Sequence, residues 1–227
     1  MLDFIASAMQ RGGLFMWPIL IFAVFAMAIS AERLYFTWFR AAINGPVFMA
    51  QIQKLILANN VDRAIRLCNS EPNAALPRVL KAGLTRANGS DDEIESAINE
   101  AVLEIAPGLA KRTSFLPMLA NVATLTGLLG TIQGLILSFD AVAHASAETK
   151  QTMLANGIAV AMYTTFAGLL VAIPSLVLHS FIQSRTWKIQ DDVDQYALKT
   201  VNLLKARRRG AAEGGGAAVE RAVAEDA

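Results

Sequence analysis

Residues 113–139 read TSFLPMLANVATLTGLLGTIQGLILSF, a run of 27 residues without Asp, Glu, Lys or Arg. A helix that spans a bilayer needs about 20 predominantly apolar residues, so this stretch is long enough to cross one. Two further uncharged runs cover residues 12–31 and 151–184. Buried helices of soluble proteins rarely continue so far without a charge. The three runs therefore predict an all-α, polytopic membrane protein with three transmembrane helices.

The composition of the whole chain agrees with this fold class. Of its 227 residues, 54% are hydrophobic and 17% are charged, and the mean hydropathy is +0.41. Soluble domains carry about 25% charged residues, so this chain has too few to cover a water-facing surface. The net charge of +1 gives no basic field that would favour nucleic acid. A single cysteine, Cys68, excludes a disulfide framework within the chain, and two histidines provide no metal cluster.

The first run has an alternative interpretation as a cleaved signal peptide. Arg11 precedes it, and small residues between 26 and 31 resemble a cleavage site. Against this, Trp17-Pro18 is unusual for such a peptide. The apolar face also continues to Phe39, as an uncleaved helix does at a membrane interface.

The distribution of basic residues predicts the orientation of the chain. Cytoplasmic loops are enriched in Lys and Arg close to the spans. Of the 20 Lys and Arg residues, only Arg11 and Lys150 lie in segments 1–11 and 140–150. We therefore expect these two segments to be external, which places the N-terminus outside and the C-terminus inside.

Between and after the spans the sequence reads as helical. Apolar residues recur at helical spacing, and Ser90 with Glu93 forms the pattern of a capping box. The predicted organisation, in chain order, is an external N-terminus (1–11), transmembrane helix 1 (12–39), a cytoplasmic helical domain (40–112), transmembrane helix 2 (113–139), an external loop (140–150), transmembrane helix 3 (151–184), a cytoplasmic helix (185–205) and a disordered tail (206–227).

The spans are nearly free of ionisable groups. His179 lies near the cytoplasmic end of the third run, and the other two runs contain none. A proton or ion path usually contains Asp, Glu, Lys, Arg or His within the membrane. This chain therefore either conducts nothing or depends on a partner for its titratable group.

Small and hydroxylated residues recur at steps of three and four along the second and third runs, so they form a stripe on each helix. Such stripes allow close helix packing, and their hydroxyl groups bond across interfaces. The alternative is that one or two of the threonines face a central pore. The stripe residues are Thr124, Gly127, Thr131, Gly134 and Ser138 on the second run and Gly157, Ala161, Thr164, Gly168, Ala172 and Ser175 on the third, with Thr165 beside them.

The same stretches resemble two motifs of a known family. The second run contains residues 126–135 (TGLLGTIQGL) followed by Phe139, and the third contains residues 157–159 (GIA), Thr165 and residues 168–174 (GLLVAIP). Together they are similar to the second-span and third-span motifs of the MotA/TolQ/ExbB proton-channel family. The three-span layout resembles the TolQ/ExbB branch rather than the four-span flagellar stator proteins.

The resemblance implies a bacterial inner-membrane homopentamer around two single-span helices of an ExbD/TolR-like partner, without a cofactor. In that family a membrane Asp of the partner carries the proton, which would explain the absence of a carboxylate here. The family's two pore threonines match Thr131 and Thr165. The residues that pack the helices together on the side of the pore would then be Thr124, Gly127, Gly134, Ser138, Ala161, Thr164, Gly168 and Ala172.

Two functions remain open from the sequence. The first is a motor subunit that couples the proton motive force to work in the cell envelope: outer-membrane transport, envelope maintenance or gliding, through an envelope-spanning effector. The second is a non-conducting scaffold that anchors cytoplasmic helices. Val160 stands where many TolQ/ExbB members carry Glu, which argues against a carboxylate supplied by this chain. An enzyme is not expected, because no nucleophile–base pair or phosphate loop is visible.

Overall fold

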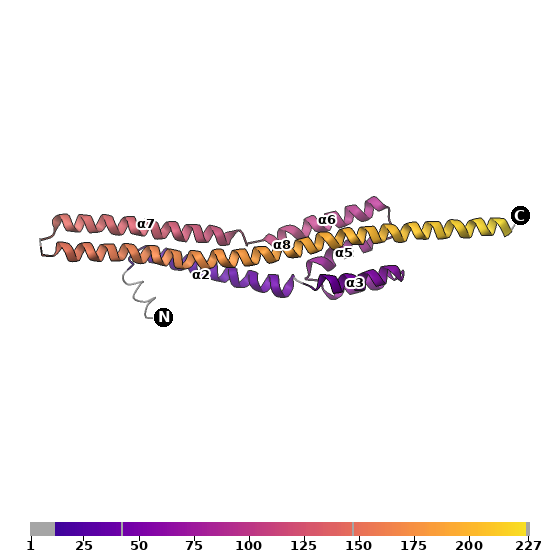
Figure 1. Ribbon diagram of the computed structural model, residues 1–227, viewed down its shortest axis with the longest axis horizontal. Helices are drawn as coiled ribbons and strands as arrows, with labels where there is room; N and C mark the ends of the chain where they lie inside the picture. The colour runs from indigo at the N-terminus through magenta and orange to yellow at the C-terminus, as the bar shows by residue number, and fades with distance from the viewer. Residues whose placement is uncertain (1–11, 42, 147, 226–227) are drawn as a thin grey trace. The chain divides into compact units, whose positions relative to one another are not determined.

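The computed structural model describes residues 12–41, 43–146 and 148–225, with the side chains of these residues except 39, 40 and 210–225. The predicted external segment 1–11 lies outside the described residues. Every described element is a helix, and no strand occurs in this part of the chain. The helices of Figure 1 divide into two compact units. We call residues 12–34 with 112–183 the membrane unit, and residues 35–111 with 184–225 the second unit.

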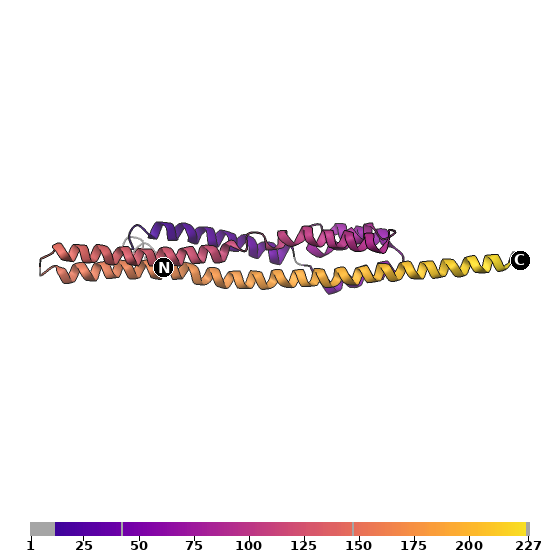
Figure 2. The ribbon, with the colours of Figure 1, turned by 90° about the horizontal axis from the view of Figure 1, so that it is seen from above.

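The membrane unit contains the apolar runs. They lie on α2 (Met16–Tyr35), on α7 (Phe115–His144) and on the first part of α8 (Lys150–Glu225). Among the residues that the structure describes, three helices are long and apolar enough to cross a membrane. Within the unit, α7 and α8 run side by side in two perpendicular views (Figures 1 and 2). The predicted fold class, an all-α multi-pass membrane protein, is confirmed.

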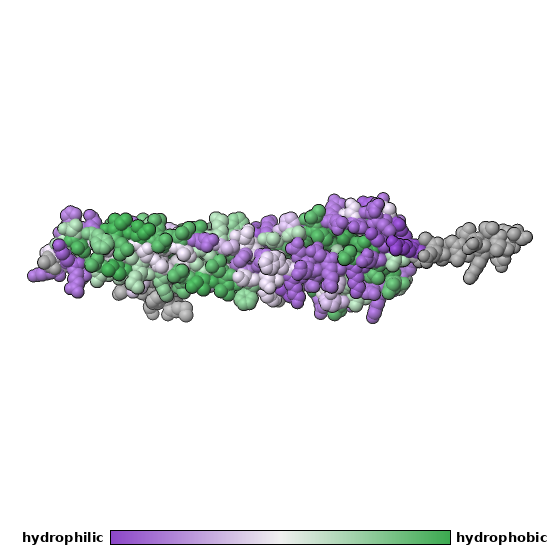
Figure 3. All heavy atoms as spheres, turned by 45° about the horizontal axis from the view of Figure 1, so that its top comes forward, coloured by the Kyte–Doolittle hydropathy of each residue, from purple (hydrophilic) through white to green (hydrophobic). Residues whose placement is uncertain are grey.

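The outer surface of the membrane unit suits lipid. Large apolar side chains such as Phe25, Leu129 and Ile136 are more than half exposed. Figure 3 shows hydrophobic residues over most of the visible face of this unit, whereas hydrophilic residues predominate on the second unit. Exposed apolar patches of this extent mark interaction with a membrane or a partner.

Helix α2 packs on the other two helices through one face. Its buried residues are Met16, Ile19, Ala26, Ser30 and Arg33, which recur at helical spacing. Met16 and Ile19 form a cluster with Ala167 of α8. Ala26 forms another with Leu116 of α7 and Ile182 of α8. Small and medium apolar side chains therefore pack α2 against α7 and α8 along most of its length.

The second unit has its own hydrophobic core. Its elements are a π-helical turn η1 (Phe36–Arg40), α3 (Gly45–Leu57), α4 (Val61–Ser70), α5 (Ala75–Thr85), α6 (Asp91–Ala110) and the later part of α8. Fully buried side chains such as Ile52, Leu80, Ile98 and Leu204 come from α3, α5, α6 and α8. The core explains why this region folds in spite of its short helices, since tertiary packing rather than propensity stabilises most helices.

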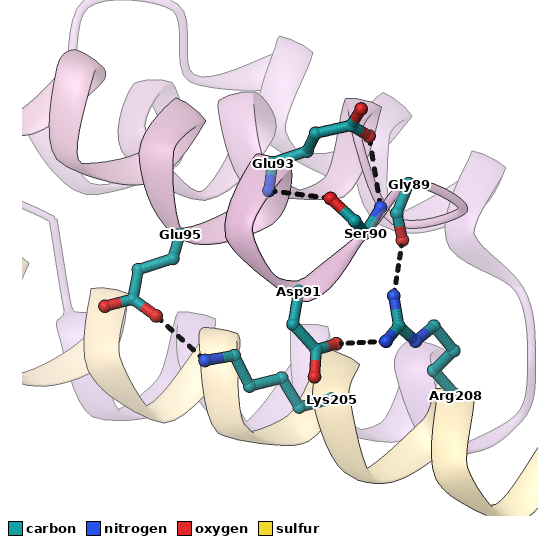
Figure 4. Close-up of polar contacts among 7 residues, drawn as sticks. All are labelled: Gly89, Ser90, Asp91, Glu93, Glu95, Lys205 and Arg208. Carbon is teal, nitrogen blue, oxygen red and sulfur yellow. Dashed lines mark hydrogen bonds and ion pairs between the residues drawn. The ribbon is translucent and has the colours of Figure 1, made fainter.

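The beginning of α6 confirms the capping box predicted from Ser90 and Glu93. The Glu93 N–H donates to the Ser90 hydroxyl at 3.2 Å, and the Ser90 N–H donates to the Glu93 carboxylate at 3.1 Å (Figure 4). Two side chains of α8 hold the same region. Lys205 pairs with Glu95 at 2.8 Å, and Arg208 pairs with Asp91 at 3.1 Å. The cap and the two ion pairs tie the first turns of α6 to α8.

Helix α8 is continuous across segments that the sequence divides into a transmembrane helix, a cytoplasmic helix and a tail. Pro174 lies inside α8 without ending it. Neighbouring groups can satisfy the backbone carbonyl that a proline releases in a membrane helix. The residues 206–225, expected to be a disordered tail, lie within this helix. The limits of the membrane-crossing segments and the orientation of the chain remain predictions.

Candidate proton-pathway site

The contact between α7 and α8 is built from residues with little or no side chain. Gly127, Gly130 and Gly134 are buried on α7 and face Ala161 and Thr164 of α8. A Cβ atom at Gly127 would lie 2.9 Å from the Thr164 carbonyl oxygen. Side chains larger than hydrogen would therefore force the two backbones apart, which explains why small residues recur on this face.

Most of the predicted stripe residues lie in this contact. Gly127, Gly134 and Ser138 of α7 are buried, as are Ala161, Thr164, Gly168 and Ala172 of α8. Thr124 is different, because its side chain is exposed and its hydroxyl donates to the Ala120 carbonyl at 3.0 Å. Close packing between the two helices describes the residues whose neighbours lie on the other helix, namely Gly127, Gly134, Ser138, Gly157, Ala161, Thr164 and Gly168.

Thr131 and Thr165 lie at the edge of the contact and are both partly buried. The Thr165 hydroxyl of α8 donates to the Gly127 carbonyl of α7 at 3.5 Å, a long hydrogen bond. Thr131 follows Gly127 by one turn, and its hydroxyl donates to the Leu128 carbonyl at 2.6 Å. The fold therefore brings the two threonines, which are 34 positions apart in the sequence, to neighbouring turns of adjacent helices.

Thr165 and the residues that contact α2 lie on different sides of α8. Helix α2 contacts α8 through Tyr163, Ala167 and Val171. Thr165 lies two positions from Tyr163 and Ala167, so its direction differs from each of theirs by about 160° around the helix. The side of α8 that carries Thr165 is therefore turned away from these contacts with α2.

The site has no charged group of its own. Residues 113–139 and 151–184 contain no Asp, Glu, Lys or Arg. His179 lies towards the far end of the third run, where its Nδ1 is 3.2 Å from the Thr113 carbonyl oxygen. In the part of the chain that the structure describes, no group of three or more His, Cys, Asp or Glu could hold a metal ion. Hydroxyl and carbonyl groups are therefore the polar groups around Thr131 and Thr165.

The structure brings together one cluster of charged residues that the sequence pattern did not predict. Arg112 makes two contacts with the Glu32 carboxylate, at 2.6 and 2.7 Å. Arg33 follows Glu32 on α2 and is only 4% exposed. The adjacent charges of Glu32 and Arg33 at the end of an apolar run could have indicated this cluster.

Comparison with known proteins identifies the family. The model of the MotA/TolQ/ExbB proton channel family matches residues 71–195, which include α7, Thr131 and Thr165. The chain belongs to this family. The resemblance seen in the two motifs is thereby confirmed. It is a family of channel and energy-transduction subunits, not of enzymes.

Individual relatives agree with this assignment. A biopolymer transport protein of the ExbB type from Vibrio cholerae is 30% identical over 177 residues, which cover 74% of each chain. An ExbB-like protein from Synechocystis is 29% identical over 178 residues, 77% of this chain and 83% of the relative. The solved structure of MotAB from C. jejuni matches with a TM-score of 0.50 at 15% identity, covering 91% of this chain and 89% of that one. This last likeness concerns the fold alone.

Proposed function

We propose that this chain is the channel subunit of a proton-driven motor that performs mechanical work in the cell envelope. Its partner is a single-span protein of the ExbD/TolR type, and its location is the bacterial inner membrane. Family membership supports the proton-channel role. The observation that carries the proposal is the pair Thr131 and Thr165 on neighbouring turns of α7 and α8, in spans without a carboxylate.

The chemistry of the threonines suits a proton carrier that belongs to the partner protein. A hydroxyl group can donate one hydrogen bond and accept two, without a charge of its own. It can therefore contact the partner's Asp both as a neutral acid and as a carboxylate. Protonation of that Asp would change its preferred contact with the Thr131 and Thr165 rings, and this change would drive movement between the two kinds of subunit.

The assembly we propose is a pentamer around two partner helices, with the N-terminus outside and the C-terminus inside. The exposed apolar side chains of the membrane unit leave surface for both lipid and neighbouring subunits. The process driven is outer-membrane transport, envelope maintenance or gliding, through an envelope-spanning effector. Val160, where many TolQ/ExbB members carry Glu, leaves the partner's Asp as the carrier in each case.

The decisive experiment measures proton flux through the complex reconstituted with its partner. Thr131→Val and Thr165→Val should each lower the flux about tenfold or more, because each removes a hydrogen bond to a charged group. Copurification of the partner should be unchanged. Thr126→Val is the matched control, since that hydroxyl donates to the Val122 carbonyl of its own helix and Thr126 lies about 140° around α7 from Thr131.

The alternative, a non-conducting scaffold, gives a different result. In that case the reconstituted complex carries no proton flux with any partner. The threonine variants then change only thermal stability. Full flux in both valine variants would instead contradict the pore role of Thr131 and Thr165.

A further inference from the structure

A groove separates part of α2 from α8 inside the membrane unit. Its cavity volume is about 400 Å³, within the range of small-molecule sites. The walls are mainly apolar, with Ala23 and Met27 on α2 and Phe166, Leu170 and Pro174 on α8. Met27 is 71% exposed and Leu170 is 56% exposed, so the groove opens onto the surface that meets lipid. We call it the α2–α8 groove.

Ser30 lines this groove with a hydroxyl group that has no hydrogen-bond partner among the described residues. Its side chain is only 6% exposed. Several other hydroxyl groups of the membrane unit donate to a carbonyl of the preceding turn of their own helix, among them Ser138 and Ser175 at 2.7 Å each. A buried hydroxyl without a partner destabilises the fold, because it has lost its hydrogen bonds to water without gaining another. The Ser30 end of the groove is therefore suited to a polar acceptor.

Cationic groups lie beyond this end of the groove. Arg33 follows Ser30 by three positions on the buried face of α2 and is 4% exposed. In the same unit, Arg112 contacts the Glu32 carboxylate at 2.6 and 2.7 Å. Two guanidinium groups thus accompany one carboxylate, which leaves this end with a net positive charge.

We propose that the α2–α8 groove binds one acyl chain of an anionic phospholipid, whose phosphate lies at Ser30, near the positive charges beyond this end of the groove. The apolar walls take the acyl chain, the Ser30 hydroxyl donates a hydrogen bond to a phosphate oxygen, and the nearby positive charge favours an anionic headgroup. The helix of a second copy would also fill the apolar walls. Its apolar side chains would, however, leave the Ser30 hydroxyl without an acceptor, which is why we favour the lipid.

The test uses the full chain, purified in detergent with any partner that copurifies, and titrated with dioleoyl-phosphatidylglycerol in native mass spectrometry. Ala23→Phe places a ring in the groove and should abolish the bound lipid. Ala28→Phe is the matched control, because Ala28 is an exposed alanine of α2 outside the groove. It should bind phosphatidylglycerol as the unchanged protein does.

Ser30→Ala tests the polar end. It should lower the affinity for phosphatidylglycerol about fivefold by removing one hydrogen bond, and leave the weaker binding of phosphatidylcholine unchanged. Equal retention of phosphatidylglycerol by the Ala23→Phe and Ala28→Phe variants would overturn the proposal. So would equal affinity for phosphatidylglycerol and phosphatidylcholine in the unchanged protein. Photocrosslinks from Leu170 to a second copy, with no lipid adduct, would assign the groove to subunit assembly.

Discussion

At the scale of single residues, Gly127 determines how closely α7 and α8 approach. Its position leaves no room for a Cβ atom, which would lie 2.9 Å from the Thr164 carbonyl oxygen and 3.3 Å from the Thr165 Cα atom. Both neighbours are backbone atoms, so they cannot move without displacing α8. The same backbone carries Thr165, and the position of that hydroxyl therefore depends on the glycine.

Gly127→Ala should destabilise the protein by about 1–3 kcal/mol, as overpacking of a filled contact does. The midpoint of thermal unfolding in detergent measures the effect. Gly108→Ala is the matched control, because a Cβ atom there meets nothing within 4 Å. Alanine at that helical position should be neutral or stabilise by up to about 1 kcal/mol. An unchanged midpoint in Gly127→Ala would contradict the close approach of the helices.

Cys68 shows how burial alone changes a side chain's chemistry. It lies in the core of the second unit and is 2% exposed. Burial raises the pKa of the Cys68 thiol from 9.0 to about 12, against a smaller opposite effect of the Lys81 charge. The thiolate is the reactive form, so the folded protein should contain almost none of it at pH 8.

We expect iodoacetamide to modify Cys68 slowly in the folded protein at pH 8 and rapidly after denaturation. The raised pKa also makes stability depend on pH. Below pH 9 the thiol is neutral in both states and has no effect. Between about pH 9 and 12 only the unfolded state ionises, so the free energy of unfolding falls as pH rises. Cys68→Ala should remove this contribution, and rapid labelling of the folded protein would show that the thiol is accessible.

At the scale of elements, the start of α6 is held by its own cap and by α8. The cap satisfies backbone N–H groups that the first turn of a helix leaves without a partner. Lys205 and Arg208 of α8 add the ion pairs to Glu95 and Asp91. Arg208 also donates to the Gly89 carbonyl at 3.0 Å, so α8 holds the turn that precedes the cap.

Ser90→Ala should weaken this start by about 1 kcal/mol and raise the hydrogen–deuterium exchange rate of the amides at 91–94 about fivefold. Ser96→Ala is the control, because Ser96 is exposed within the same helix and away from the cap. Equal exchange in the two variants would mean that the ion pairs to α8, rather than the cap, fix the first turn of α6.

At the scale of the whole molecule, orientation determines which segments face the outside of the membrane and which face the cytoplasm. The basic residues predict an external connection between α7 and α8 and an internal second unit. Ser146 and Ser96 are exposed residues on the two predicted sides. The buried native thiol gives little background in a labelling experiment.

An impermeant maleimide should label Ser146→Cys in intact spheroplasts and should label Ser96→Cys only after the membrane is permeabilised. The physical reason is that a charged reagent does not cross the hydrocarbon layer. Labelling of cells that express the unchanged chain is the control for Cys68. The reverse pattern would place the C-terminus outside and would contradict the predicted topology.

The sequence by itself determined the fold class and the position of the apolar helices. An uncharged run such as 113–139 can be recognised as a membrane span from the sequence, because the thickness of the bilayer fixes the length of a spanning helix. It also determined which residues share a face, because helical periodicity places Gly127, Thr131 and Gly134 on one stripe. The capping box of Ser90 and Glu93 could also be predicted, since it depends only on residues that are close together in the chain.

Only the tertiary structure decided which faces meet. It placed the Thr165 hydroxyl against the Gly127 carbonyl, left Ser30 buried in the α2–α8 groove, and joined α8 to the start of α6. The helical period specifies the face of the helix on which a residue lies, but not which residue of another helix it contacts. A neighbour depends on how closely two helices approach, and that distance is set by the packing of all the side chains between them.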